Sequence, residues 1–188
     1  MEKVLILRHG ESEKFKGTKG QQDIPLSRQG RAFMGLIAQI LQIEQIPYEL
    51  VISSPLKRAI ESASILNTKR VPQIVSPSFN ELDVGSLSKK AEGMPLSEYD
   101  KLARQEGAET SSAALGRMLE GLAGLKPLEA KNGLLVTHSI VMNLLAYGLS
   151  QTGGLQVQGP FEYGCGFLVN LETMQIESVF PPESYFEE

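Results

Sequence analysis

The sequence contains a single cysteine, Cys165, among its 188 residues. One cysteine forms no intramolecular disulfide and cannot build a cysteine-based zinc cluster. No apolar stretch reaches the ~18 residues that a membrane-spanning helix needs. The opening Met1-Glu2-Lys3 leads straight into a short apolar run, without the longer apolar region of a signal peptide. We therefore expect a cytoplasmic protein that has no membrane partner.

The sequence also lacks an excess of positive charge. Its formal net charge is −4, whereas a general nucleic-acid-binding protein normally carries a basic surplus, so we expect no nucleic-acid partner. A locally basic pocket is still compatible with this value, because net charge does not describe the field inside a cleft. The hydrophobic content of 41% is typical of a globular protein. The length fits one domain that covers residues 1–188.

Short apolar runs alternate with amphipathic segments along the chain. The runs predict strands at residues 4–8, 49–53, 73–75 and 133–137, and a final hairpin from 166–171 and 175–180. The amphipathic segments predict helices between residues 27 and 47, at 55–66, 97–105 and 112–122, and from 140 onward. This alternation is typical of the α/β class, as a three-layer sandwich in which a mostly parallel sheet carries helices on both faces.

Three local signals add detail to this prediction. Ser27 has the character of an N-cap, and apolar residues follow it at helical spacing, namely Phe33, Leu36, Ile37, Ile40 and Leu41. Ser54 is interpreted as the cap of the next helix, with Pro55 at its first position. Residues 86–112 are polar and irregular apart from the short helix near 97–105, which indicates a small cap-like insertion.

The chain has only two histidines, His9 and His138, and each directly follows an apolar strand. In a parallel sheet the carboxyl ends of the strands open onto one edge, where ligands bind in open α/β sheets. Arg8 precedes the first histidine, and Arg58 lies one turn into the helix after the second strand. Arginine donors suit a phosphate group, and histidine can act as nucleophile, acid or base. Taken singly, each residue has a plain alternative, a surface turn or a solvated helix face.

Five segments resemble the histidine phosphatase superfamily, the phosphoglycerate-mutase-like proteins of branch 1 with the Arg-His-Gly motif. In chain order they are Arg-His-Gly-Glu at 8–11, Asp-Ile-Pro-Leu-Ser at 23–27 with Gly30, Ser-Ser-Pro-Leu-Lys-Arg-Ala at 53–59, Phe-Asn-Glu at 79–81 with Gly85, and Val-Thr-His-Ser at 136–139. Any one segment is a weak signal, but five in register are specific. The resemblance covers most of the chain.

The resemblance implies a metal-independent phosphomonoesterase without a cofactor. His9 would attack phosphorus and form a phosphohistidine intermediate, while Arg8, Arg58 and His138 hold the phosphoryl oxygens. Glu81 would protonate the leaving oxygen. Further phosphate or substrate contacts are expected from Ser12, Lys19, Gly20 and Ser139. The partner would be a small phosphorylated molecule.

The sequence departs from the family pattern where substrate contacts are expected. The Asn that many members carry shortly after the first motif is absent from residues 13–16, Glu-Lys-Phe-Lys, so its phosphate contact is either missing or replaced by Ser12. Lys19-Gly20 stands in place of Gln-Gly, and Ser139 in place of a glycine. These changes bear on the identity of the substrate, which the sequence does not name, as it does not name the oligomeric state.

Three alternatives to the phosphomonoesterase are open. Phosphoglycerate-mutase-type phosphotransfer is one, although the short region 86–112 favours water as the acceptor. A protein phosphohistidine phosphatase is the second, although such proteins tend to lack an acid like Glu81. The third is a non-catalytic phosphate-binding module, because a fold by itself does not determine function.

Overall fold

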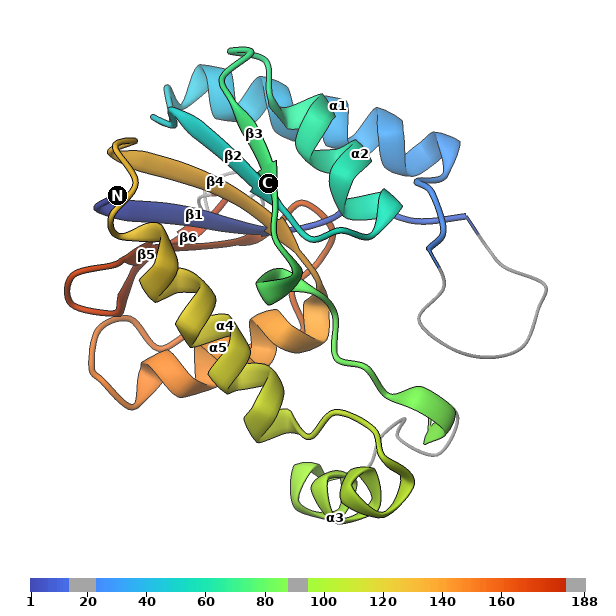
Figure 1. Cartoon of the computed structure of the whole chain (residues 1–188). Coiled ribbons are helices and arrows are strands. Elements are labelled where there is room, and N and C mark those ends of the chain that lie inside the picture. Colours follow the sequence, from blue (N-terminus) through green and yellow to red (C-terminus); the bar gives the residue numbers. More distant parts are fainter. Residues whose placement is uncertain (14–22, 88–94, 182–188) are drawn as a thin grey trace.

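The computed structural model describes residues 1–13, 23–87 and 95–181. Within them the strands form one sheet in the order β3-β2-β4-β1-β5-β6 (Figure 1). The parallel strands are β1 (Lys3–Arg8), β2 (Leu50–Ser53), β3 (Gln73–Val75) and β4 (Asn132–Thr137). The antiparallel hairpin consists of β5 (Gly166–Asn170) and β6 (Gln175–Phe180). The predicted mostly parallel sheet is therefore confirmed.

Helices cover both faces of this sheet. In chain order they are α1 (Arg28–Ile43), α2 (Lys57–Leu66), α3 (Leu96–Glu106), α4 (Ser111–Leu125) and α5 (Ser139–Ser150), with short 3₁₀ turns η1 (Pro77–Phe79) and η2 (Gly85–Leu87). Figure 1 shows α1 and α2 on one face and α4 and α5 on the other. This arrangement confirms the predicted α/β sandwich. In the described part of the chain, no helix combines the length and the apolar character needed to cross a bilayer.

The central strand β1 is buried on both faces. Val4 and Ile6 belong to the apolar cluster beneath α4 and α5, whereas Leu5 and Leu7 belong to the cluster beneath α1 and α2. This division follows from strand geometry, since successive side chains point to opposite faces. A strand with two buried faces needs apolar side chains at every position, and residues 4–7 form such a continuous apolar run. Both clusters together fix the position of the strand that ends in the first histidine.

The N-cap predicted for α1 is confirmed, since the Ser27 hydroxyl accepts a hydrogen bond from the Gly30 N–H at 2.9 Å. Two of the apolar residues that predicted the helix, however, do not pack inward. Phe33 is 41% exposed and Leu36 is 54% exposed, while Met34 is fully buried. The apolar stripe of α1 is wider than the face that contacts the sheet, so part of it remains at the surface.

The predicted start of α2 at Pro55 is wrong, because the helix begins at Lys57 with Leu56 as its N-cap residue. The carboxylate of Asp23 accepts the Lys57 N–H at 2.6 Å and thereby caps the helix from a different part of the chain. Ser54 accepts the Leu56 N–H at 3.3 Å. Its hydroxyl has a second partner in the candidate site, described below. A cap supplied from a distant segment leaves no local sequence signal.

The region predicted as a cap-like insertion, 86–112, contains α3 and part of η2, while residues 88–94 lie outside the described part of the chain. Helix α3 lies beyond one end of α4 (Figure 1). Tyr99 and Ala103 of α3 are buried and join the apolar cluster that α4 and α5 share. One domain with a cap-like insertion over 86–112 remains a prediction.

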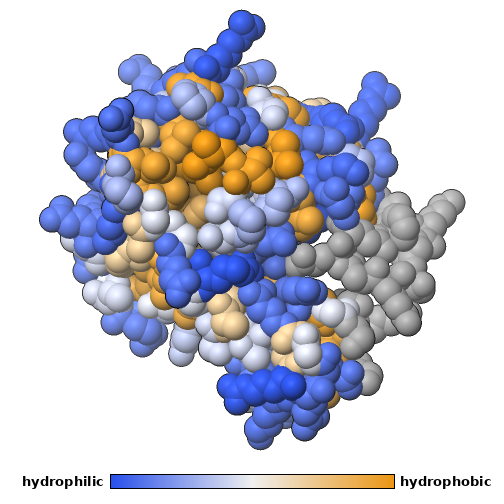
Figure 2. All heavy atoms as spheres, viewed as in Figure 1, coloured by the Kyte–Doolittle hydropathy of each residue, from blue (hydrophilic) through white to orange (hydrophobic). Residues whose placement is uncertain are grey.

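Strand β3 forms one edge of the sheet. Its Ile74 and Val75 side chains are 38% and 49% exposed. Figure 2 shows apolar atoms gathered on this side of the molecule, within a surface that is otherwise largely hydrophilic. The strand is only three residues long, which limits edge-to-edge pairing with another chain. None of the predicted site residues lies on this strand.

Candidate active site

Strand register brings the candidate residues together at the carboxyl edge of the sheet. Arg8 at the end of β1 is in register with Thr137 at the end of β4. The His9 N–H donates to the Thr137 carbonyl at 3.0 Å, which extends this pairing by one residue. The Ser54 N–H donates to the Val136 carbonyl at 3.0 Å, so the end of β2 joins the same cluster. The residues that follow β1, β2 and β4 are therefore neighbours.

The two histidine rings lie against each other. Their centroids are 4.9 Å apart and their planes make an angle of 62°. His9 is 7% exposed and His138 is completely buried. The prediction that both histidines share one sheet edge is thus met in the geometry, and their roles in a reaction remain a proposal.

The orientation of His9 is determined by two hydrogen bonds. Its Nδ1 lies 2.6 Å from the Gly10 carbonyl oxygen, which can only accept, so Nδ1 carries the proton. The Arg58 Nε–H donates to Nε2 at 3.1 Å. The Gly10 N–H donates to the buried Ser62 hydroxyl at 3.0 Å, and this hydrogen bond fixes the turn that follows β1. The tautomer that results has its lone pair on Nε2, the atom that a nucleophilic histidine would use.

The environment keeps both rings neutral. Burial lowers the pKa of His9 to about 3, because the imidazolium form loses its hydration, and the Gly10 carbonyl offsets part of this effect. The charges of Arg58 and Arg8 lower the pKa of His9 further. Burial also lowers the pKa of His138 well below its usual value, with additional repulsion from its charged neighbours. Near pH 7 the lone pair of His9 is therefore available.

This buried neutral histidine predicts a pH dependence of stability. The pKa of His9 is about 3 in the folded chain, against 6.5 for an ordinary histidine. Between these pH values His9 is protonated in the unfolded chain but not in the folded chain, so acidification favours unfolding. From pH 7 to pH 5, His9 is expected to remove about 2 kcal/mol from the free energy of unfolding. The measurement is urea unfolding of the wild type and of His9→Gln at both pH values. The variant should lose correspondingly less stability, and equal losses in both proteins would contradict the prediction.

His138 is held by the end of β2. Its Nε2 lies 2.7 Å from the Ser54 hydroxyl, and this hydroxyl lies 3.2 Å from the Asn80 side-chain oxygen. The Ser54 hydroxyl donates its one proton to the Asn80 oxygen, so in this arrangement it accepts from the Nε2–H of His138. It can donate to Nε2 of His138 only when its proton leaves the Asn80 oxygen. The Nδ1 atom of His138 is buried and has no hydrogen-bond partner among the residues that the structure describes. A buried polar atom of this kind indicates a place for a ligand group.

The Arg8 guanidinium contacts a backbone carbonyl and an aromatic ring. Its Nη1 donates to the Phe161 carbonyl at 2.6 Å, and its Cζ lies 4.0 Å from the centroid of the Tyr163 ring. The Tyr163 ring is also 6.0 Å from the ring of His9. The Nε atom of Arg8 is buried without a hydrogen-bond partner in the described part of the chain. Arg8 therefore joins the cluster with a donor still available for a ligand.

Glu81 lies on an irregular loop between η1 and η2 and meets the first turn of α5. Its Oε1 accepts from its neighbour's N–H, that of Leu82, at 2.9 Å and from the Val141 N–H at 3.3 Å. Burial raises the pKa of Glu81, although these N–H groups and the charge of Arg58 oppose the shift. The attraction between Glu81 and Arg58 places the carboxyl group within electrostatic reach of the histidine cluster. A raised pKa suits a carboxyl group that has to supply a proton near neutral pH.

Four further residues were predicted to contact phosphate or substrate. Ser12 lies three residues after His9 and forms an isolated backbone bridge with Leu26. Ser139 is the first residue of α5, directly after His138. Lys19 and Gly20 lie outside the described residues. The substrate contacts of these four residues remain predictions.

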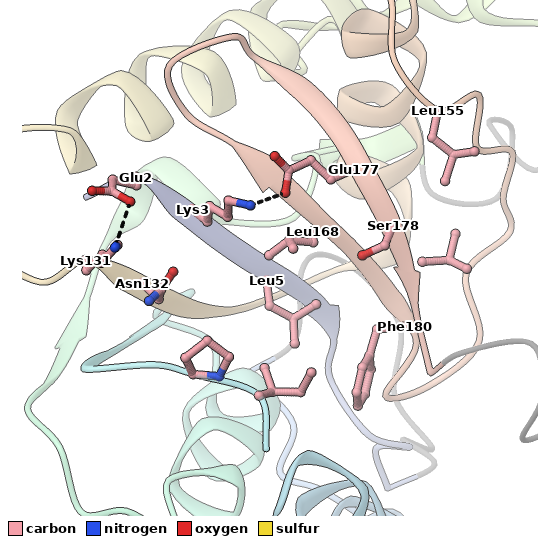
Figure 3. A pocket seen from close by; sticks show the side chains of 14 residues that line it. Glu2, Lys3, Leu5, Lys131, Asn132, Leu155, Leu168, Glu177, Ser178 and Phe180 are labelled. Atoms are coloured by element: carbon pink, nitrogen blue, oxygen red, sulfur yellow. Dashed lines mark hydrogen bonds and ion pairs between the residues drawn. The ribbon is translucent and has the colours of Figure 1, made fainter. Parts of the chain in front are cut away.

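Two cavities lie at opposite sides of the fold. One of about 950 Å³ is near the amino ends of β1 and β4 and is lined by residues such as Leu5, Leu168 and Phe180 (Figure 3). Its charged side chains are ion-paired in Figure 3, Lys3 with Glu177 and Glu2 with Lys131, and no histidine lines it. A second cavity of about 450 Å³ borders Glu81 and is also lined by Asn80, Asp83, Glu109 and Arg117. This cavity adjoins the candidate site on the side of Glu81, and another of about 330 Å³ adjoins it on the side of Tyr163.

Comparison with known proteins identifies the family. The model of the histidine phosphatase superfamily (branch 1) matches residues 4–164. The chain belongs to this superfamily. The match spans the histidine cluster from β1 to α5 and includes Tyr163. The resemblance that the sequence motifs indicated is confirmed, and the chain is an enzyme of the histidine phosphatase superfamily.

Individual proteins are similar to this chain in sequence or in fold. The uncharacterized phosphatase PhoE of Bacillus subtilis is 30% identical over 157 residues, which cover 80% of this chain and 78% of PhoE. The structure of YhfR from Bacillus stearothermophilus aligns with a TM-score of 0.71 at 19% identity and covers 93% of this chain and 94% of that one. A mycobacterial glucosyl-3-phosphoglycerate phosphatase, solved with VO3, aligns with a TM-score of 0.69 at 21% identity over 96% and 98% of the two chains. These structures share the fold.

Several residues of the candidate site were not predicted from the sequence. Ser54 was interpreted as a helix cap, yet its hydroxyl contacts His138. Tyr163 lies in none of the five family segments, yet its ring stacks on Arg8. Arg117 of α4 had no motif around it, yet it contacts the loop that carries Glu81. Only Ser54 carried a usable signal, because it directly follows a strand, as both histidines do.

Proposed function

We propose that this enzyme is a metal-independent phosphomonoesterase that forms a phosphohistidine on His9. The observation that carries the proposal is the neutral, Nδ1-protonated ring of His9, whose Nε2 lone pair contacts Arg58. The lone pair attacks phosphorus, a P–N bond forms and the P–O bond to the leaving group breaks. A water molecule then attacks phosphorus, the P–N bond breaks, and inorganic phosphate leaves with His9 neutral again.

Three side chains stabilise the transferred phosphoryl group in this proposal. Arg58 moves its donor from Nε2 of His9 to a phosphoryl oxygen as the lone pair engages phosphorus. Arg8 contributes its Nε–H, which has no hydrogen-bond partner among the described residues. His138 contributes Nδ1–H in the tautomer whose Nε2 accepts from Ser54, and for this the Ser54 hydroxyl turns its proton from the Asn80 oxygen to His138. Donors fixed before the reaction stabilise developing charge without a reorganisation cost.

Glu81 acts as the acid and then as the base. It donates its proton to the leaving oxygen as the P–O bond breaks, so the product departs as an alcohol rather than as an alkoxide. It then takes a proton from the attacking water. The raised pKa of Glu81 supports this assignment, because it increases the protonated fraction near neutral pH. An acid is needed most for esters with a poor leaving group, so small alkyl phosphates are the proposed substrates.

The other family activities are secondary to this proposal. Phosphotransfer of the phosphoglycerate mutase type and hydrolysis of protein phosphohistidine would both use the same His9 chemistry. The named phosphatase PhoE, similar over most of its length, supports hydrolysis. A non-catalytic phosphate-binding module would retain the anion site but not need Glu81. A cytoplasmic location remains a prediction.

Hydrolysis of 4-nitrophenyl phosphate in EDTA tests the proposed function. We expect turnover that survives chelation, because the arginines and His138 supply the positive charge and hydrogen bonds that a metal ion would otherwise supply. Vanadate should inhibit competitively, as the mycobacterial relative was solved with VO3. The matched control is Arg28→Gln, a change at an exposed residue of α1, which should leave the rate unchanged. Inactivity on this ester and on a panel of alkyl phosphates would favour the binding module instead.

A further inference from the structure

The loop that carries Glu81 has little regular structure of its own to hold it. Residues 80–84 lie between η1 and η2 and form no helix or strand. A general acid must nevertheless keep its carboxyl group within hydrogen-bond reach of the leaving oxygen, and small misplacements are costly. The groups that hold this loop therefore bear on the reaction.

Arg117 holds the loop on its amino-terminal side. Its Nη1 donates to the Ser78 carbonyl at 2.9 Å and to the Asn80 carbonyl at 3.1 Å, with a longer contact of 3.4 Å to the Pro77 carbonyl. Arg117 is part of α4, and its side chain is only 25% exposed. The guanidinium has a fixed fork of donors, so it can satisfy several carbonyls at a turn where no helix or sheet does so.

Glu109 holds the loop on the other side of the acid. The Glu109 N–H donates to the Asp83 carbonyl at 2.9 Å, and the Asp83 N–H donates to the Glu109 carboxylate at 3.2 Å. The same carboxylate accepts from Nε and Nη2 of Arg117 at 2.8 and 2.9 Å. The backbone on both sides of Glu81 is thus tied to one bidentate ion pair, which comes from α4 and the segment before it.

We propose that Arg117 and Glu109 are positioning residues that hold residues 80–83 so that Glu81 is directed at the leaving oxygen. This inference rests on the proposed function, in which Glu81 is the proton donor. Neither residue is a catalytic residue, because both act through the loop. The pair determines how well the enzyme handles esters whose leaving group needs a proton.

The test compares two esters of similar shape, 4-nitrophenyl phosphate and 4-nitrobenzyl phosphate. The first releases a phenol that leaves without help, whereas the second releases an alcohol that needs a proton. We compare kcat/KM, which reports the phosphorylation of His9 and not the later hydrolysis. Arg117→Gln should lower kcat/KM for the benzyl ester by about 10-fold or more and for the phenyl ester by less than about 3-fold. Arg117→Lys should restore only part of the loss, because lysine lacks the fork of donors.

Three further variants make the result specific. Arg104→Gln, at an exposed arginine of α3, is the matched control and should change neither ester. Glu109→Gln removes the charge of the pair in a second way and should give the same preference for the phenyl ester. In a Glu81→Gln background, Arg117→Gln should add no further loss on the benzyl ester, since both changes act on one proton transfer.

The outcomes separate this inference from the proposed function. If Glu81→Gln lowers kcat/KM for both esters equally, the acid role of Glu81 fails and the inference fails with it. If Glu81→Gln is selective for the benzyl ester but Arg117→Gln and Glu109→Gln are not, only the inference is overturned. Equal losses on both esters in these two variants, with a lower unfolding midpoint, would show a merely structural ion pair.

Discussion

Replacement of His9 by alanine is expected to lower turnover of any phosphate ester by roughly 10⁴-fold or more, the scale seen when a covalent nucleophile is removed. The reason is that the proposed route passes through a P–N bond on Nε2, for which alanine offers no atom. The fold should survive, because the histidine is buried in its neutral form and forms no ion pair with any of the described residues. The measurement is phosphate release from a panel of esters, together with the unfolding midpoint of each protein.

Trapping of the intermediate provides a sharper version of the same test. The chain contains only two histidines, so a phosphohistidine formed from a labelled ester lies on His9 or on His138. After an alkaline quench, which preserves phosphohistidine, label should be found in the wild type and in His138→Ala but not in His9→Ala. Label that persists in His9→Ala would reject the proposed nucleophile.

Replacement of Arg58 by glutamine is expected to lower kcat/KM by roughly 10²–10³-fold, as for other groups that stabilise charge in a transition state. Arg58 is the residue whose donor touches the attacking nitrogen and whose charge interacts with Glu81. Glutamine retains some hydrogen bonding but neither the charge nor the fork of donors. Arg58→Lys should recover only part of the activity, since an ammonium group is a point charge.

Vanadate binding separates the role of Arg58 in the site from a role in folding. Arg58→Gln should weaken vanadate inhibition along with activity, whereas the surface change Arg28→Gln should affect neither. The unfolding midpoint of Arg58→Gln should stay close to that of the wild type, because burial already lowers the pKa of this arginine and makes its charged form costly. Full activity in Arg58→Gln would exclude the arginine from the phosphate site.

Much of the fold follows from patterns that are local in the sequence. The apolar run before His9 and the run before His138 each form a strand in the predicted place, with every inner residue buried. Such runs are informative because a strand covered on both faces needs apolar side chains at every position. The start of α2 could not be predicted in this way, because its cap comes from Asp23, 34 residues earlier in the chain.

The site was predictable to the extent that its residues sit at strand ends. His9 and His138 could be paired in advance, because parallel strands bring their carboxyl ends to one edge. The contacts of Ser54, Tyr163 and Arg117 could not, because they depend on how helices and loops pack over that edge. No spacing in the sequence relates Arg117 to the loop it holds.

By itself, therefore, the sequence determined which residues are available and the order of strands and helices that brings two histidines to one end of the sheet. The tertiary structure alone decided what state those residues are in. Burial at the end of β1 and the carbonyl of Gly10 together leave the lone pair of His9 on Nε2. Burial against α5 raises the pKa of Glu81. Hydration and hydrogen bonding depend on the neighbours in space, and most of these neighbours are distant in the chain.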